Sequence, residues 1–341
     1  MKNLTKRETA GILSKGIPAY LLGYPTVVSF EMTYSCTCNC HHCNMGGIVK
    51  DEQLIGPADY RRLVRELKPV IVQISGGEPL LRDDLTDVMR AIKSKGSSTP
   101  YLIVVTNGSL LTEQKYLALR KAGMNQLSVS LCFPDERHDS WRRAKGLYDH
   151  LNTLVPRLAA LGHDDIVLNS AITMENMPYI MDLARTAERW GVSISFSAYS
   201  VLRTGNRGYT IESPEDLAKL RAQLDELKSY KKIDCGRILN ADFNIDGTFD
   251  FFKCGEIKPC SAGQHFLVVT PQGYLKPCSM HDKVYTSQRE IKRSFVPNND
   301  CGGCYVSIRS YLDKSLPELV REYFKTYSIR RKVNGHSAGA A

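Results

Sequence analysis

The chain has 341 residues, of which 43% are hydrophobic and 24% charged, and its formal net charge is +9. This length accommodates one large domain with a smaller one attached, and no apolar run approaches the roughly 18 residues that a membrane span requires. The positive charge is spread along the chain except at residues 330–332, so a solvated basic surface is favoured over an anionic substrate or membrane surface, and no nucleic-acid partner is expected.

The first part of the chain predicts an α/β fold. Residues 1–25 form an N-terminal extension, and residues 1–15 lack the apolar core of a secretory signal, so we expect a cytoplasmic protein. Between residues 26 and 196, short β-branched runs alternate with helical patterns, which is typical of βα units that build a parallel sheet. We expect six strands, at residues 26–32, 70–75, 101–106, 126–131, 165–171 and 192–196. We expect helices at 57–67, 84–95, 112–122, 145–161 and 177–190.

Beyond Ser200 the alternation stops. A helix is predicted at 214–229, followed by Gly- and Cys-rich short strands between residues 240 and 276, with a domain boundary near residue 235. Residues 307–327 carry apolar side chains at helical spacing, and we expect this helix to pack on the body rather than to lie on a membrane surface. The expected domains are a core at 26–234, an auxiliary domain at 235–328, and a disordered basic tail at 329–341.

The eleven cysteines fall into groups. In a chain without a secretory signal they are interpreted as metal ligands or reactive thiols, because the cytosol keeps thiols reduced. Cys36, Cys40 and Cys43 follow the first expected strand with three and then two residues between them. Three thiolates on one loop can hold three irons of a 4Fe–4S cluster, which leaves the fourth iron open to a small molecule.

A second motif follows the second expected strand and consists of Gly76, Gly77, Glu78 and Pro79. Together with the cysteine loop and its placement, it resembles the radical S-adenosylmethionine (SAM) superfamily over residues 26–310. The resemblance implies a partial (β/α)6 barrel of the TIM type, in which SAM chelates the open iron. One electron then cleaves SAM to methionine and a 5′-deoxyadenosyl radical, which abstracts hydrogen from an unactivated C–H bond.

The resemblance also implies roles for individual residues. Cys36, Cys40 and Cys43 become the cluster ligands, and His42 stands where the family has an aromatic residue near the adenine. The segment from Gly76 to Pro79 becomes the edge that binds the SAM amino group, because glycines let backbone approach a ligand and the Glu78 carboxylate complements an ammonium. Four more residues at or after strand ends are candidates for contacting SAM, although each could be an ordinary hydrogen-bonding or surface residue: Ser130, Arg143, Asn169 and Ser170.

Cys38 departs from the family pattern, because the loop then holds four cysteines. A zinc site is the alternative for such a group, but structural zinc ligands usually come in two separated pairs. Zinc would also leave the Gly-Gly-Glu-Pro segment without a role. We therefore expect Cys38 to be a spare or outward-facing thiol.

The last quarter of the chain contains a second cysteine set, which consists of Cys260, Cys278, Cys301 and Cys304. Four thiolates complete the coordination of a cluster, and residues 266–269 and 273–275 read as a hairpin between these cysteines. The set resembles the auxiliary twitch domain, a shortened relative of the SPASM domain, and so implies a second 4Fe–4S cluster. A zinc ribbon is the alternative, since thiolates serve both metals. A closed cluster near the substrate would accept an electron and favour net oxidation.

The sequence alone leaves three functions open. We expect an oxidoreductase that acts on a small molecule of a cofactor, pigment, lipid or secondary-metabolite pathway, with an electron donor such as flavodoxin or ferredoxin. A maturase that modifies a peptide or protein is the first alternative, and the short N-terminal extension disfavours it. A non-enzymatic iron–sulfur or zinc protein is the second, and it would need neither a vacant iron nor a ligand shelf. Peripheral membrane contact is not favoured.

Overall fold

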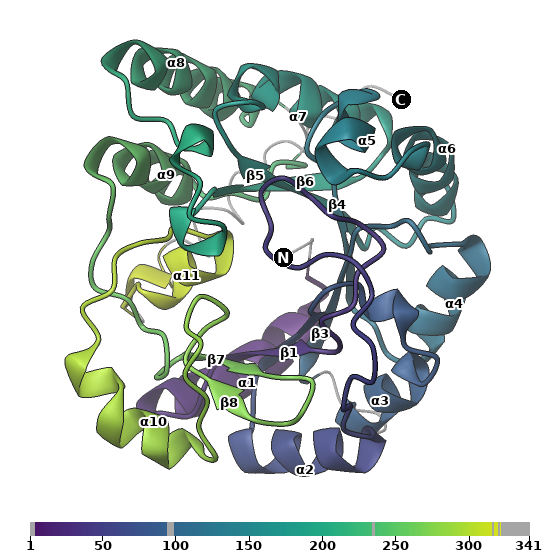
Figure 1. The fold of residues 1–341 in the computed structure, drawn as a ribbon, viewed down its shortest axis with the longest axis vertical. Coiled ribbons are helices and arrows are strands. Elements are labelled where there is room, and N and C mark those ends of the chain that lie inside the picture. Colours follow the sequence, from purple (N-terminus) through teal and green to yellow (C-terminus); the bar gives the residue numbers. More distant parts are fainter. Residues whose placement is uncertain (1–3, 94–98, 234–235, 316, 320, 322–341) are drawn as a thin grey trace.

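A curved sheet of parallel strands organises the computed structural model, which describes residues 4–93, 99–233, 236–315, 317–319 and 321. Six of its strands follow one another in sequence and in space (Figure 1). They are β1 (Val27–Glu31), β2 (Ile71–Ser75), β3 (Tyr101–Thr106), β4 (Gln126–Ser130), β5 (Ile166–Ile172) and β6 (Ser193–Ala198). The expected partial (β/α) barrel is confirmed, with every strand within two residues of its predicted position.

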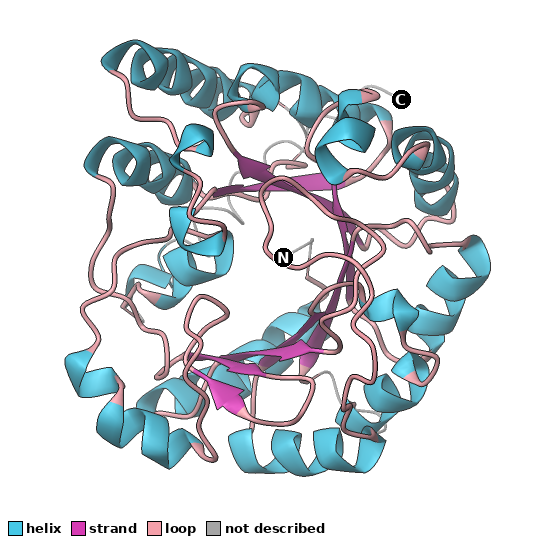
Figure 2. Ribbon diagram, in the orientation of Figure 1, coloured by secondary structure: helices cyan, strands magenta, loops and turns pink. Residues whose placement is uncertain are grey.

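Helices cover the outer, convex face of this sheet (Figure 2). Those that connect the strands are α2 (Pro57–Leu67), α3 (Leu85–Ile92), α4 (Glu113–Lys121), α5 (Arg137–Arg142), α6 (Leu147–Ala159) and α7 (Ile180–Arg189), and α8 (Pro214–Tyr230) follows β6. Side chains alternate between the two faces of a strand. Phe30 of β1 points outward and meets the Tyr60 ring of α2 edge-on at 5.2 Å, so its neighbours Ser29 and Glu31 point to the inner face.

The C-terminal part of the chain extends the sheet at the β1 edge. Strand β7 (Phe266–Val269) runs parallel to β1, and β8 (Leu275–Lys276) pairs antiparallel with β7 as the hairpin predicted from the sequence. At the opposite edge, the β6 backbone bonds the segments around Ile238 and Tyr305. The C-terminal part therefore contacts both edges of the open barrel. The helices α9 (Asp242–Cys254), α10 (Gln288–Ser294) and α11 (Ser307–Leu312) belong to it.

Within the described part of the chain, four helices were not anticipated: α5, α9, α10 and one in the N-terminal extension. Residues 242–254 form α9 where short strands were predicted, because Phe251, Phe252 and Ile245 bury one helical face and Gly255 ends the helix in a left-handed conformation. The N-terminal extension contains α1 (Lys6–Leu21), which begins at a capping box between Thr5 and Glu8.

Helix α1 covers the amino ends of the strands. Its Glu8 carboxylate accepts from Asn125, just before β4, and its Tyr20 ring stacks on His265, just before β7. The predicted helix at 307–327 begins as α11, and much of its remainder lies outside the described residues. No helix within the described residues is long and apolar enough to cross a membrane.

Candidate active site at the carboxyl ends of the strands

The cysteine loop leaves β1 at its carboxyl end and crosses the mouth of the barrel (Figure 1). Cys36, Cys38 and Cys40 are buried and Cys43 is partly exposed. Cys38 is therefore not the outward-facing thiol that we expected. It is 2% exposed, and its thiol hydrogen-bonds with the sulfurs of both Cys36 and Cys40, which lowers the pKa of each to about 6.

The sulfur of each of the three predicted ligands accepts a hydrogen bond from an N–H group. Cys36 Sγ accepts from the Asn107 side chain at 3.5 Å, Cys40 Sγ from Arg142 at 3.8 Å, and Cys43 Sγ from the Met45 backbone at 3.4 Å. Such donors stabilise the thiolate form. Among the contacts of the described residues, the Cys38 sulfur accepts no N–H, and its hydrogen bonds to the Cys36 and Cys40 sulfurs, together with burial, raise its pKa. These N–H donors thus separate Cys38 from the other three, although burial also raises the pKa of Cys43.

The Gly-Gly-Glu-Pro segment holds the cysteine loop by backbone pairing. Gly77 N–H donates to the Thr33 carbonyl at 2.7 Å, and Glu78 N–H donates to the Ser35 carbonyl at 2.8 Å. A Cβ atom on Gly77 would lie 2.1 Å from the Ser35 oxygen, and one on Gly76, whose φ is 121°, would lie 2.5 Å from the Thr33 oxygen. The glycines therefore allow close approach of this chain to itself, and their expected approach to a ligand stays a prediction.

Glu78, which was expected to bind the SAM ammonium, is already engaged by the protein. Its side chain is fully buried, and its oxygens accept from Leu80 N–H at 3.0 Å, Thr106 hydroxyl at 2.7 Å and Asn107 N–H at 2.8 Å. Burial raises the pKa of this carboxyl to about 7, although these donors oppose the shift. Glu78 therefore joins the ends of β2 and β3 and positions Asn107. Pro79 is buried and opens the short 3-10 turn after Glu78.

His42 lies among aromatic side chains at the mouth of the barrel. Its ring stacks on Trp141 at 5.7 Å with the planes 11° apart, and Trp141 Nε1 donates to His42 Nδ1 at 2.7 Å. Burial and the nearby Arg142 lower the pKa of His42 to about 3, so the ring is neutral. The position where the family has an aromatic residue is thus occupied by the neutral imidazole of His42, which the Trp141 indole holds.

The arginine that faces the site is Arg142 and not Arg143. Arg143 ends α5 with φ 52° and is exposed, whereas Arg142 is buried and also reaches Cys132 Sγ at 3.3 Å. A helix turns its face by about 100° per residue, so neighbouring side chains point in different directions. No local pattern chooses between two adjacent arginines. Cys132, a lone cysteine, was likewise not recognised as a neighbour of the loop.

The remaining strand-end candidates separate onto two faces. Ser130 and Asn169 pair across β4 and β5 and are partly exposed on the inner face. Ser170 is 2% exposed, and its hydroxyl accepts from Asn176 on the other side of the sheet at 3.3 Å. Because alternate residues of a strand face opposite sides, Asn169 and Ser170 cannot both line the interior.

The second cysteine set gathers beside the β7–β8 hairpin. Cys278 follows β8 directly, burial raises its pKa to about 12, and the charges of Cys304, Cys260 and Cys301 act on it. Its sulfur accepts from Met280 N–H at 3.3 Å. The structure therefore brings all four predicted ligands into one neighbourhood.

A buried arginine organises this second set. Arg309 of α11 is 6% exposed, and it contacts Cys304 Sγ at 3.7 Å, the Cys304 carbonyl, and the Pro259 carbonyl at 3.1 Å. Its guanidinium also pairs with Asp313 at 2.8 Å, whose other oxygen accepts from Ser261 N–H at 2.9 Å. Sequence analysis missed Arg309, because it lies on a helix with no motif around it.

The donors at both sets suit iron–sulfur clusters. Thiolate sulfurs that accept N–H groups are typical of cluster ligands, and the three-cysteine loop and the four-cysteine set match an open and a closed cluster. Thiolates also bind zinc, so a zinc site is the alternative at the second set.

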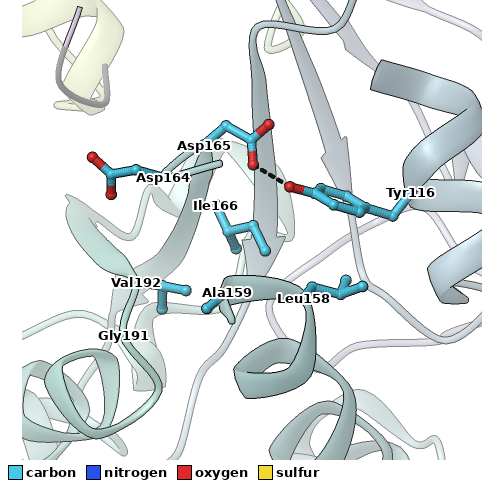
Figure 3. Close-up of a pocket in the computed structure, with 8 residues that line it drawn as sticks. All are labelled: Tyr116, Leu158, Ala159, Asp164, Asp165, Ile166, Gly191 and Val192. Atoms are coloured by element: carbon cyan, nitrogen blue, oxygen red, sulfur yellow. Dashed lines mark hydrogen bonds between the residues drawn. The ribbon is translucent and has the colours of Figure 1, made fainter. Parts of the chain in front are cut away.

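A small pocket lies at the opposite end of the sheet and is not this site. Asp164 and Asp165 at the amino end of β5 line it together with Tyr116, whose hydroxyl donates to Asp165 at 2.5 Å (Figure 3). Sites in parallel barrels form at the carboxyl ends of the strands. The pocket is therefore a packing feature.

Comparison with known proteins gives consistent matches. A family model described as the radical SAM superfamily matches residues 30–187. The mycofactocin maturase MftC of Mycolicibacterium smegmatis is 23% identical over 77% of this chain and 67% of its own. The AdoMet-dependent heme synthase of Oleidesulfovibrio alaskensis is 23% identical over 95% of this chain and 80% of its own. The crystal structure of Streptococcus suis SuiB bound to its precursor peptide SuiA aligns with a TM-score of 0.61 and 16% identity, over 84% of this chain and 68% of that one.

Proposed function

Since this chain belongs to the radical SAM superfamily, we propose that it is a maturase that modifies a peptide by removing hydrogen from an unactivated C–H bond. The family's cofactors are a 4Fe–4S cluster and SAM, which together supply the radical that removes this hydrogen. The observation that carries the proposal is the loop at the carboxyl end of β1, where three sulfurs each accept an N–H group.

In this proposal Cys36, Cys40 and Cys43 hold the cluster. Asn107 and Arg142 donate toward two of these sulfurs and so stabilise negative charge on them. Glu78 holds the Asn107 backbone at 2.8 Å, which fixes the distance between the cysteine loop and the end of β3.

The rest of the mouth contributes the SAM contacts. His42 with Trp141 offers a flat neutral surface suited to an adenine, and Ser130 and Asn169 offer polar groups on the inner face. The carbonyls of the turn at Gly76 and Gly77 lie next to the loop and suit an ammonium. Arg142, which faces the sulfurs, replaces Arg143 as the basic candidate, and Ser170 is not included because it faces away.

We also propose that Cys260, Cys278, Cys301 and Cys304 hold an auxiliary 4Fe–4S cluster. Arg309 supports it by binding the carbonyls of the loops that bear Cys260 and Cys304. Because β7 pairs with β1, this set is attached to the strand that leads into the first cysteine loop. That placement suits an acceptor for an electron from the substrate, and hence net oxidation.

A peptide substrate is favoured over the small molecule expected from the sequence. The relative MftC is named a maturase, and SuiB, which shares the fold, was crystallised with a precursor peptide. A small molecule is the second candidate, because the heme synthase matches 95% of the chain. The reductant proposed is a flavodoxin or ferredoxin.

The experiment is anaerobic reconstitution with iron and sulfide, followed by reduction in the presence of SAM. We expect about eight irons per chain, since each cluster holds four, and formation of 5′-deoxyadenosine. Incubation with small peptides encoded beside the gene, read by mass spectrometry, should show the loss of two hydrogens from one of them. Well-reconstituted protein that does not cleave SAM would refute the proposal, and modification of a porphyrin but of no peptide would select the second candidate.

A further inference from the structure

Two charged side chains, Glu31 and Lys276, share the inner face of the barrel. Glu31 points inward from the end of β1, as does Ser29, whose hydroxyl meets that of Ser75 at 2.8 Å. Lys276 of β8 pairs with Val268 of β7, which in turn lies beside Ser29. Residues that are directly opposite in a sheet share a face, so Lys276 is on the same side as Glu31.

Both side chains are buried, and neither has a partner among the residues that the structure describes. Glu31 is 3% exposed and Lys276 is 8% exposed. Among the described residues neither makes a hydrogen bond or an ion pair, and Glu31 Oε2 is fully buried with nothing to bind. Burial raises the pKa of Glu31, although Lys276 and Arg203 oppose this shift. Arg203 itself is half-buried and directed to the Asn44 side chain at 3.5 Å.

Buried polar groups in folded proteins find partners, since a desolvated charge without one is costly. Nearby inner-face residues such as Ser75, Ser130 and Asn169 are partly exposed, so molecules can reach this face from the mouth of the barrel. The partner of Glu31 and Lys276 is therefore expected to enter from outside.

The charges of the pair define the chemistry of that partner. Glu31 accepts hydrogen bonds, Lys276 donates them, and their charges cancel. A free carboxylate would be repelled by Glu31, and a free amine by Lys276. A neutral dipolar group that donates through N–H and accepts through C=O satisfies both, and the amide is such a group.

We propose that Glu31 and Lys276 form a binding site for an amide of the substrate, with the N–H on Glu31 and the carbonyl on Lys276. The inference rests on the proposed function to the extent that a peptide supplies the amide. The site lies five residues before Cys36 along the chain and two before Cys278. It would hold the substrate between the two cysteine sets.

The test measures binding, so that it does not depend on turnover. The reconstituted, SAM-bound full chain is titrated by calorimetry with acetyl-trialanine amide. It is then titrated with a series of analogues, in each of which one backbone amide is replaced by an ester. The wild type should bind the amide about tenfold more tightly than at least one ester, because a charge-assisted hydrogen bond is lost. Equal binding of the amide and all esters would overturn the inference.

Variants assign the effect to the pair. Glu31→Leu should abolish the preference for the amide over the ester, and Lys276→Met should weaken the amide about tenfold. Lys283→Met, an exposed lysine just beyond the same hairpin, should behave as wild type. If Glu31→Leu prefers the amide over the ester as strongly as the wild type does, Glu31 has no role in binding. If that variant loses iron, the comparison of amide and ester binding in the wild type still decides the inference. Failure of the proposed function appears separately, as absence of SAM cleavage or of peptide modification.

Discussion

Arg142 Nη1 lies 3.8 Å from Cys40 Sγ, so a buried cation stands beside one of the sulfurs proposed to hold the first cluster. Reduction adds a negative charge to a cluster, and a neighbouring cation favours that change.

Arg142→Gln should therefore lower the midpoint potential of the first cluster, by on the order of 50 mV for a loss of about 1 kcal/mol. A potentiometric titration followed by electron paramagnetic resonance measures it. Arg143→Gln, at the exposed neighbour, is the matched control and should leave the midpoint potential unchanged. Equal potentials in the two variants would contradict the assignment of Arg142.

Substitution should distinguish Cys38 from the three predicted ligands of the first loop by iron content. Cys40→Ala should lose about four irons per chain together with SAM cleavage, because a 4Fe–4S cluster is removed. Cys38→Ala should keep both, since its sulfur accepts no N–H among the described contacts. Iron analysis of the reconstituted proteins gives the answer, and loss of iron in Cys38→Ala would make it a ligand.

The second set should be independent of SAM cleavage. Cys278→Ala should lose about four irons and the oxidised product while 5′-deoxyadenosine still forms. Cys254→Ala, an exposed cysteine in the same part of the chain, is the control. Metal analysis that finds zinc at this set in protein purified anaerobically, with unchanged product formation, would contradict the auxiliary cluster.

The close approach at Gly77 predicts that a methyl group suffices to disturb the site. Gly77→Ala places Cβ where the Ser35 oxygen lies, so the cysteine loop must shift, at a cost of more than about 2 kcal/mol. Gly56→Ala, where nothing lies within 4 Å, should cost much less. Denaturant unfolding and iron content compare the two. Normal iron content and stability in Gly77→Ala would show that the backbone pairing is not needed.

Lys93 predicts a pH dependence of stability. Its amine donates to Asn125 at 2.6 Å and to the Pro100 carbonyl at 2.8 Å, but burial lowers its pKa from 10.5 to about 8. Between these values the unfolded chain binds more protons than the folded one, so this group makes stability rise with pH. The unfolding free energy of wild type relative to Lys93→Met should increase by about 2 kcal/mol from pH 8 to pH 10. A fall with pH in this comparison would contradict the shift.

The sequence alone determined the features that depend on neighbours in the chain. The six βα units followed from period and length, and the spacing of Cys36, Cys40 and Cys43 indicated the cofactor chemistry, because one loop supplies all three thiols. The hairpin between Phe266 and Lys276 was likewise local. The helix at 242–254 was missed, because its Phe, Ile and Thr residues also suit strands and only packing of its aromatic face decides the conformation.

Tertiary structure decided what depends on packing between distant segments. It turned Arg142 inward and Arg143 outward, buried Cys38 between two other sulfurs, and used both oxygens of Glu78 within the protein. It also placed Lys276 on the face of Glu31, although they are 245 positions apart in the sequence, because β7 pairs with β1. Such contacts arise from side-chain packing and strand register, neither of which has a signal in local spacing.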